Sequence, residues 1–124
     1  MARVALAAPG EVRALLHAAH TDKTDPGRHY SVEAMLRAGQ CWKVEEGGAI
    51  VGALVTTEEQ GGLWVSMAAG RSVEDLTAVL AAHLDEHAKG RYRSIGFQTA
   101  RRGLVKKARA HGYQVSAYIV RKEL

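Results

Sequence analysis

The chain has 124 residues, of which 47% are hydrophobic and 24% are charged. This length and balance fit one globular domain, 1–124, with a single core. No apolar stretch approaches the roughly 20 residues of a membrane-spanning helix, and the apolar start is too short for a secretory signal, so we expect no membrane association. The single cysteine, Cys41, excludes an intrachain disulfide and favours a reducing, cytoplasmic location.

The net charge of +4 is unevenly distributed along the chain. Residues 1–90 carry 8 Lys or Arg against 12 Asp or Glu, whereas residues 91–124 carry 9 against 1. This basic region could attract the phosphates of a nucleic acid or of a nucleotide-bearing cofactor, and a solvated helix face explains it equally well. The residues that would contact nucleic acid are Arg101, Arg102, Lys106, Lys107 and Arg109, with Arg91 and Arg93 nearby.

The first half of the chain predicts a strand, two helices and a hairpin. Residues 3–7 suggest a short strand, and Pro9 begins a helix whose apolar positions recur at helical spacing. Ser31 is expected to cap a second helix that Gly39 ends. Two strands at 41–45 and 49–55 then flank the turn at Gly47 and Gly48.

The second half predicts two further strand-to-helix units. A turn at residues 60–62 leads into a strand at 63–69, which completes an antiparallel meander. Ser72 is the expected N-cap of the next helix, with Asp75 three residues later in a capping box. A strand at 92–99, a basic helix at 101–111 and a final strand at 113–120 follow, and Gly112 separates the last two. Trp42, Trp64 and Tyr113 fall in these strands and are expected to pack in the sheet.

This element order resembles the GNAT (GCN5-related N-acetyltransferase) family over nearly the whole chain. Three segments carry the resemblance: Val44–Val55 in the hairpin, the strand-to-helix run that begins at Leu63, and Phe97–Tyr113 near the end. The last segment is similar to small bacteriophage-encoded members. The fold expected is therefore α/β (α+β) and GNAT-like, with a mixed central sheet, antiparallel meander strands and about four helices.

The resemblance implies that acetyl-CoA binds between the fourth and fifth strands. The strand residues implied for the cofactor are Ser66, Met67 and Ala68, and the residues of the phosphate loop are Gly70, Arg71 and Ser72. A helix N-terminus suits this role because its free N–H groups and dipole attract anions. The residues implied for the acyl acceptor are Gln98, Thr99 and Arg101.

The chain departs from the family pattern in two places. The phosphate loop is short, and a Ser72 side chain that caps its own helix would compete with a phosphate. The resemblance also places Ala108 where a tyrosine often acts as general acid, and Arg101 where asparagine is common. Glu58, Glu59 and Tyr118 are the candidate general bases, and the spacing does not select among them.

One short motif points to metal chemistry. His83 to His87 matches H-x-x-E-H, which on a helix can place two zinc ligands on one face. No third ligand is evident, and histidines at a helix C-terminus are favoured by the dipole alone. We therefore expect no metal site.

Two functional hypotheses follow. The first is an N-acetyltransferase-like enzyme that transfers an acyl group from acyl-CoA to an amine, with a degenerate cofactor site. The alternative is a non-catalytic protein of the same fold, a bacteriophage virion or host-interaction component that binds protein, a second copy of itself or nucleic acid. In that case the location would be the host cytoplasm or the virion.

Overall fold

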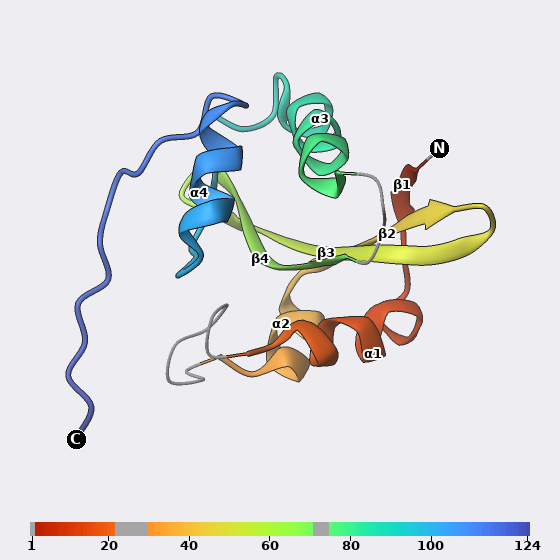
Figure 1. Cartoon of the computed structure of the whole chain (residues 1–124), viewed down its shortest axis with the longest axis horizontal. Coiled ribbons are helices and arrows are strands. Elements are labelled where there is room, and N and C mark those ends of the chain that lie inside the picture. Colours follow the sequence, from red (N-terminus) through yellow and green to blue (C-terminus); the bar gives the residue numbers. More distant parts are fainter. Residues whose placement is uncertain (1, 22–29, 71–74) are drawn as a thin grey trace.

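The computed structural model describes residues 2–21, 30–70 and 75–124. Within these residues a five-stranded sheet in the order β1-β2-β3-β4-β5 lies between two pairs of helices (Figure 1). Neighbouring strands from β1 to β4 are antiparallel, and β4 and β5 are parallel. The prediction of a mixed α/β fold with a meander and four helices is confirmed.

The first pair of helices follows β1 (Arg3–Leu6). Helix α1 spans Pro9–Ala19, and α2 spans Val32–Ala38. The side chain of Ser31 accepts a hydrogen bond from the Ala34 N–H at 3.3 Å, and Gly39 is the C-cap of α2, so both predicted ends of this helix are confirmed.

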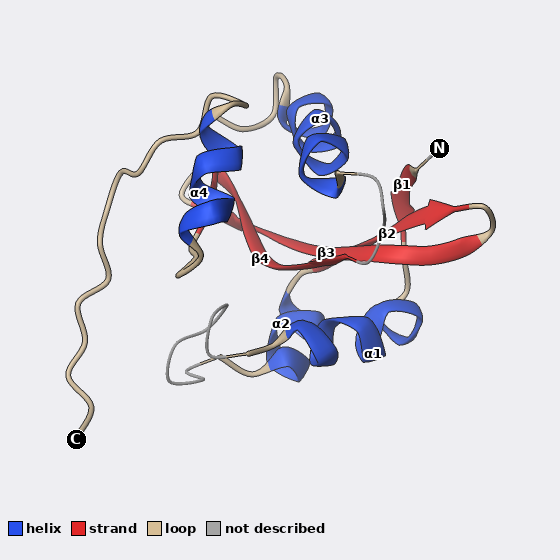
Figure 2. Cartoon of the chain, viewed as in Figure 1, coloured by secondary structure: helices blue, strands red, loops and turns tan. Residues whose placement is uncertain are grey.

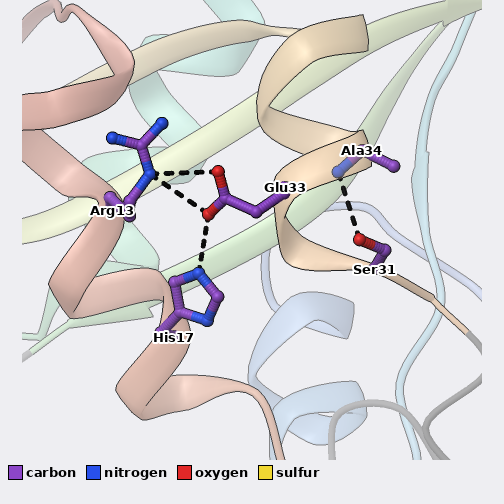
Figure 3. Close-up of polar contacts among 5 residues, drawn as sticks. All are labelled: Arg13, His17, Ser31, Glu33 and Ala34. Atoms are coloured by element: carbon purple, nitrogen blue, oxygen red, sulfur yellow. Dashed lines mark hydrogen bonds and ion pairs between the residues drawn. The ribbon is translucent and has the colours of Figure 1, made fainter.

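An exposed charge cluster joins α1 to α2 (Figure 3). The Arg13 Nε donates to both carboxylate oxygens of Glu33 at 3.1 Å, and the His17 Nε2 lies 2.7 Å from Glu33 Oε2. These hydrogen bonds, the one to His17 foremost, lower the pKa of Glu33. Because all three side chains are exposed, we expect the cluster to orient the helices more than to stabilise the fold.

The meander consists of β2 (Gln40–Glu46), β3 (Ala49–Glu59) and β4 (Gly62–Gly70). Gly47 and Gly48 both have positive φ and form the two-residue turn between β2 and β3, as their sequence predicts. The turn from β3 to β4 also has two residues with positive φ, 49° at Gln60 and 82° at Gly61.

Alternation along β2 and β3 divides the core between the two faces of the sheet. Cys41, Ala53 and Val55 pack with α1 and α2 on one face. Trp42 and Leu54 pack with α3 on the other face. The indole N–H of Trp42 donates to Thr56 Oγ1 at 3.0 Å, which satisfies two polar groups buried between the sheet and α3.

The second pair of helices is α3 (Leu76–Ala88) and α4 (Arg102–Arg109), and the three-residue strand β5 (Ile95–Phe97) lies between them in sequence. Strand β5 is much shorter than the predicted strand at 92–99. Figure 2 shows both helices on the face of the sheet opposite α1 and α2. No helix in the described part of the chain is long and apolar enough to cross a membrane.

The predicted final strand at 113–120 is wrong for this structure. Gly112 has φ of 90° and ends α4 as predicted, but residues 113–124 then form an extended tail without regular structure (Figure 2). A strand needs a neighbour to pair its backbone groups, and the alternation of Tyr113, Val115, Ala117 and Ile119 supplies only a suitable side-chain pattern.

Gly39 offers a test of how tightly α2 is joined to the sheet. A Cβ at this position would collide with the Val55 side chain and lie 2.9 Å from the backbone oxygen of Thr56. We expect Gly39→Ala to lower the free energy of unfolding by about 1–3 kcal/mol, as overpacking does in cores. Urea unfolding would measure the loss. The control is Gly10→Ala, where no atom lies within 4 Å, and an equal loss in both variants would contradict the packing argument.

Candidate functional site

The sheet divides where β4 and β5 separate. Strand β4 pairs with β3 as far as Gly70, but it pairs with β5 only from Leu63 to Val65. Beyond Val65, no described residue pairs with the edge of β4 that faces β5. The backbone groups of Ser66 to Gly70 on this edge are therefore available to a ligand.

A cavity of about 590 Å³ opens between this part of β4, helix α3 and helix α4. Its volume is that of an ordinary small-molecule site. Most of its wall is apolar and comes from these three elements and from β5, with Val65, Leu76, Leu80, Leu84, Phe97 and Leu104 among the lining residues. Its polar groups are Asp75, Thr77, Arg101, Lys107, His111 and Tyr113.

A second cavity of about 290 Å³ is lined from the α1 and α2 side of the same separation. Its polar side chains include Tyr30, Glu59, Ser66, Gln98 and Thr99. Both cavities are lined by a common set of residues: Ala19, Val65, Ala68, Phe97, Arg101 and Leu104. The two cavities therefore meet where β4 and β5 separate.

The structure brings most of the predicted site residues to these cavities. For the cofactor set, Ser66 and Met67 line the second cavity, Ala68 lines both, and Gly70 lines the first. Arg71 and Ser72 lie outside the described residues. For the acceptor set, Gln98 and Thr99 line the second cavity and Arg101 lines both.

Helix α3 begins later than the sequence predicts. Asp75 is its N-cap, and the Asp75 side chain accepts a hydrogen bond from the Thr77 N–H at 3.0 Å. Asp75 was expected inside the helix, as the third residue after a Ser72 cap. Instead its carboxylate lies at the positive end of the helix dipole, where it satisfies one free amide and opposes a second anion.

Positive charge in the first cavity comes from α4 rather than from α3. Arg101 is the N-cap residue of α4, and its backbone N–H donates to Thr99 Oγ1 at 3.0 Å. Lys107 lies on the same helix and lines the first cavity, whereas its neighbour Lys106 lines neither cavity. The sequence places Lys107 only in the general basic region, and its helical position relative to Leu104 and Ala108 is the signal that could have singled it out.

No family model matches the chain, and no curated protein matches it. Solved structures do match. An acetyltransferase of Bacillus subtilis in complex with CoA superposes with a TM-score of 0.73 at 19% identity, over 94% of this chain and 79% of that one. A GNAT family acetyltransferase from Elizabethkingia anophelis with acetyl-CoA bound gives 0.73 at 16% identity, over 94% and 78%. A GNAT family acetyltransferase from Streptococcus pneumoniae gives 0.66 at 14%, over 99% and 100%.

The chain has the GNAT fold. At these identities the likeness establishes the architecture, and the chemistry has to be argued from the residues of this chain.

Ala108 is buried and lines the first cavity, so no phenol projects from the position where the resemblance expects one. Tyr113 lines the same cavity and packs edge-to-face on Phe97, with ring centroids 5.6 Å apart. Burial, assisted by the negative charge of Asp85, raises the pKa of Tyr113. The sequence assigned Tyr113 to a final strand and missed this position.

The three candidate general bases occupy different environments. Glu59 lines the second cavity. Glu58 accepts a hydrogen bond from the Tyr92 hydroxyl at 2.7 Å, which raises the pKa of Tyr92, and Glu58 is not among the residues of either cavity. Tyr118 is 89% exposed on the C-terminal tail. Of these three, only Glu59 therefore lines a cavity.

The H-x-x-E-H motif packs against the sheet. The rings of His83 and His87 are parallel, and both meet Trp42 edge-on, with centroid distances of 4.6 and 5.0 Å. Among the described residues, no group of three or more His, Cys, Asp or Glu side chains could hold a metal ion. The contacts of the two histidines are those of aromatic packing.

His83 should make the stability of the fold depend on pH. Its Nε2 is buried and has no hydrogen-bond partner among the described residues, and burial together with His87 lowers the pKa of His83. The unfolded chain binds a proton at His83 as the pH falls below about 6.5, while the folded chain resists it, so stability is lost on acidification through this range.

We expect His83→Leu to reduce the loss of stability between pH 7 and pH 5, as measured by urea unfolding at each pH. The variant should also be at least as stable as the parent at pH 7, because a buried polar atom without a partner is removed. His111→Leu, at an exposed histidine in the turn after α4, is the control. An unchanged pH dependence in His83→Leu would contradict the assignment.

Proposed function

We propose that the chain binds acetyl-CoA in the first cavity and transfers the acyl group to an amine that enters through the second cavity. The observation that carries this proposal is the separation of β4 from β5, with a cavity on each side and a shared lining. Such a passage lets two substrates approach one point from opposite ends. The solved structures of this fold with CoA or acetyl-CoA bound support the choice of cofactor.

Acetyl-CoA supplies an activated thioester. Attack by a neutral amine forms a C–N bond, the C–S bond breaks, CoA leaves as the thiolate, and one amine proton is released. The unpaired backbone groups of Ser66 to Ala68 would hold the pantetheine arm and orient the carbonyl at the junction of the cavities. Much of the rate would come from this positioning.

Glu59 is the best-placed carboxylate to accept the amine proton, directly or through water, because it lines the second cavity. The thiolate would take its proton from solvent, since Ala108 provides no acid. Carboxylate and hydroxyl groups around the second cavity also suit a cationic acceptor before it loses a proton. We infer a primary amine as the acceptor class.

Arg101 and Lys107 would bind the phosphates of CoA. A helix N-terminus usually fills this role, but Asp75 places a carboxylate on α3 at this point. Both basic side chains line the same cavity as Asp75. The phosphates would therefore be attracted by side chains of α4 and not by the N-terminus of α3.

A non-catalytic protein of this fold is the second candidate. The Asp75 carboxylate at the helix terminus and the apolar Ala108 favour it, because both remove features that help turnover. It predicts that the protein can bind a partner without forming an acylated product. Nucleic acid would then contact the exposed basic residues in and just before α4, which are Arg101, Arg102, Lys106, Lys107 and Arg109. Arg101 and Lys107 also line the first cavity.

Calorimetry with CoA and acetyl-CoA tests the proposal. We expect saturable binding by the parent protein and at least about tenfold weaker binding by Lys107→Glu, because a favourable charge becomes an unfavourable one. The matched control is Lys106→Glu, which makes the same change one residue away and should bind nearly as the parent does. No binding at millimolar CoA, or equal losses in both variants, would overturn the assignment of the first cavity.

Turnover separates the two candidates. Acetyl-CoA is incubated with a short peptide carrying a free α-amine and a lysine, and with a polyamine, and mass spectrometry follows the acylated products. An acylated amine that depends on the protein and decreases in Glu59→Gln supports the enzyme. Binding of CoA with no product from any amine supports the non-catalytic candidate.

Asp75→Asn should tighten CoA binding several-fold. Asparagine keeps an oxygen that can accept the Thr77 N–H bond, so the cap survives, but the negative charge beside the phosphate site is removed. The control is Glu86→Gln, which removes one exposed negative charge from the same helix away from both cavities. Calorimetry at low ionic strength would measure the change, and weaker binding by Asp75→Asn would show that the carboxylate is needed.

A further inference from the structure

We propose that the second cavity selects an arylalkylamine, a primary amine that carries a flat aromatic ring on a short alkyl chain, and that Trp64 determines this selection. The inference rests on the proposed function, because it names the acceptor class of the same site. In the bound acceptor, the ammonium group lies beside Glu59 and the aromatic ring lies beside Trp64.

Aromatic and sulfur-containing side chains are concentrated at the second cavity. The chain has two Trp, four Tyr and one Phe, and three of these line the cavity: Tyr30, Trp64 and Phe97. Two of the three methionines, Met35 and Met67, line it as well. Aromatic rings and thioethers both make favourable contacts with a further aromatic ring. The volume of about 290 Å³ suits a small molecule of this kind.

The two tryptophans of the chain have different surroundings. Trp42 is buried, its indole N–H donates to Thr56, and its ring meets two histidines edge-on. Trp64 is only partly buried. In the part of the chain that the structure describes, no aromatic ring packs on Trp64 and no group accepts a hydrogen bond from its indole N–H. The Trp64 ring is therefore available to a ligand in the cavity.

Gly96 allows the Trp64 ring to lie against the neighbouring strand. The two residues are paired positions of β4 and β5. A Cβ at position 96 would lie 3.0 Å from Cζ3 and 3.1 Å from Cε3 of the indole, which is closer than two carbon atoms normally pack. The indole therefore occupies space that a side chain on β5 would fill, and it forms part of the cavity wall there.

Glu59 supplies the charge that recognises an ammonium group. It is the only carboxylate among the described residues that line the second cavity. Thr57 pairs with Trp64 and Glu59 pairs with Gly62, so Glu59 and Trp64 are diagonal neighbours on one face of the sheet. Such neighbours are about 7–8 Å apart, a distance that an aromatic ring and its amine cover with a short alkyl chain between them.

The same groups disfavour two other kinds of amine. A polyamine carries a second ammonium group, for which the described lining has no second carboxylate. An α-amino acid carries a carboxylate beside its amine, which Glu59 would repel. Arg101 lines both cavities, but its guanidinium is assigned to the phosphates of CoA. The acceptor is therefore an amine without a neighbouring acid group.

Calorimetry with the CoA-loaded protein compares ligands of similar size. We expect phenethylamine to bind at least about threefold more tightly than cyclohexylethylamine, which has the same charge and alkyl chain but no aromatic ring. Putrescine and phenylalanine should each bind at least about tenfold more weakly than phenethylamine. Equal binding of the two ring compounds, or tighter binding of putrescine or phenylalanine, overturns the inference.

Variants assign the preference to the two residues. Trp64→Leu should bind the two ring compounds equally, whereas Trp64→Phe should keep the preference because it retains a flat ring. Glu59→Gln should weaken the binding of both amines at least about threefold. Its matched control is Glu58→Gln, which changes the adjacent carboxylate, lines neither cavity and should bind as the parent does. A preference that Trp64→Leu retains, or equal losses in the two glutamine variants, overturns the inference.

Nuclear magnetic resonance of the parent protein reports the contact without turnover, with and without CoA. Phenethylamine should shift the indole N–H signal of Trp64, which Trp64→Phe identifies by its absence. The signal of Trp42 should not shift, because Thr56 holds its N–H. An unchanged Trp64 signal overturns the inference. If the same protein acylates other amines, only the acceptor class is refuted, whereas a protein that binds no CoA and acylates no amine refutes the proposed function.

Discussion

The two-sided burial of β3 is the constraint on which the rest of this structure depends. Ala53 and Val55 are buried against α1 and α2, while Leu54, between them, is buried on the face that carries α3. A single strand therefore holds both layers of helices on the sheet. Trp42 extends this arrangement to β2, because its indole packs under α3 and its N–H is satisfied by Thr56 across the strand pair. A one-residue slip of register would exchange the two cores.

The pairing between neighbouring strands is shortest between β4 and β5, and the candidate site lies there. Strand β4 is paired along its length with β3, but it shares only three paired positions with β5. The resulting separation exposes backbone groups between two layers that are otherwise well packed. A strand that is paired along its length on one edge and open on the other suits the positioning of a ligand, because its backbone is held by the rest of the sheet.

The electrostatics of the first cavity follow from how each helix begins. Helix α3 uses Asp75 to satisfy an amide at its N-terminus, which places negative charge where an anion would otherwise bind. Helix α4 has no acidic residue in its first turn and contributes Arg101 and Lys107 to the same cavity. Under the proposed function, the phosphates of the cofactor would therefore be attracted mainly by side chains of α4, and the contribution of the α3 dipole would be reduced.

The sequence alone determined the elements whose signals are local. Ser31 and Gly39 marked the ends of α2, the paired glycines marked the first hairpin, and periodicity placed α1 and the meander, because caps, turns and alternation act over a few residues. The strand residues Ser66 to Ala68 and the acceptor residues Gln98 to Arg101 were located by resemblance and do line the cavities. Tertiary structure decided that Asp75 caps α3, that Lys107 rather than Lys106 reaches the cavity, and that β5 is short. It also decided that the tail from Tyr113 forms no strand, because pairing depends on a neighbouring edge and not on the alternation of the segment itself.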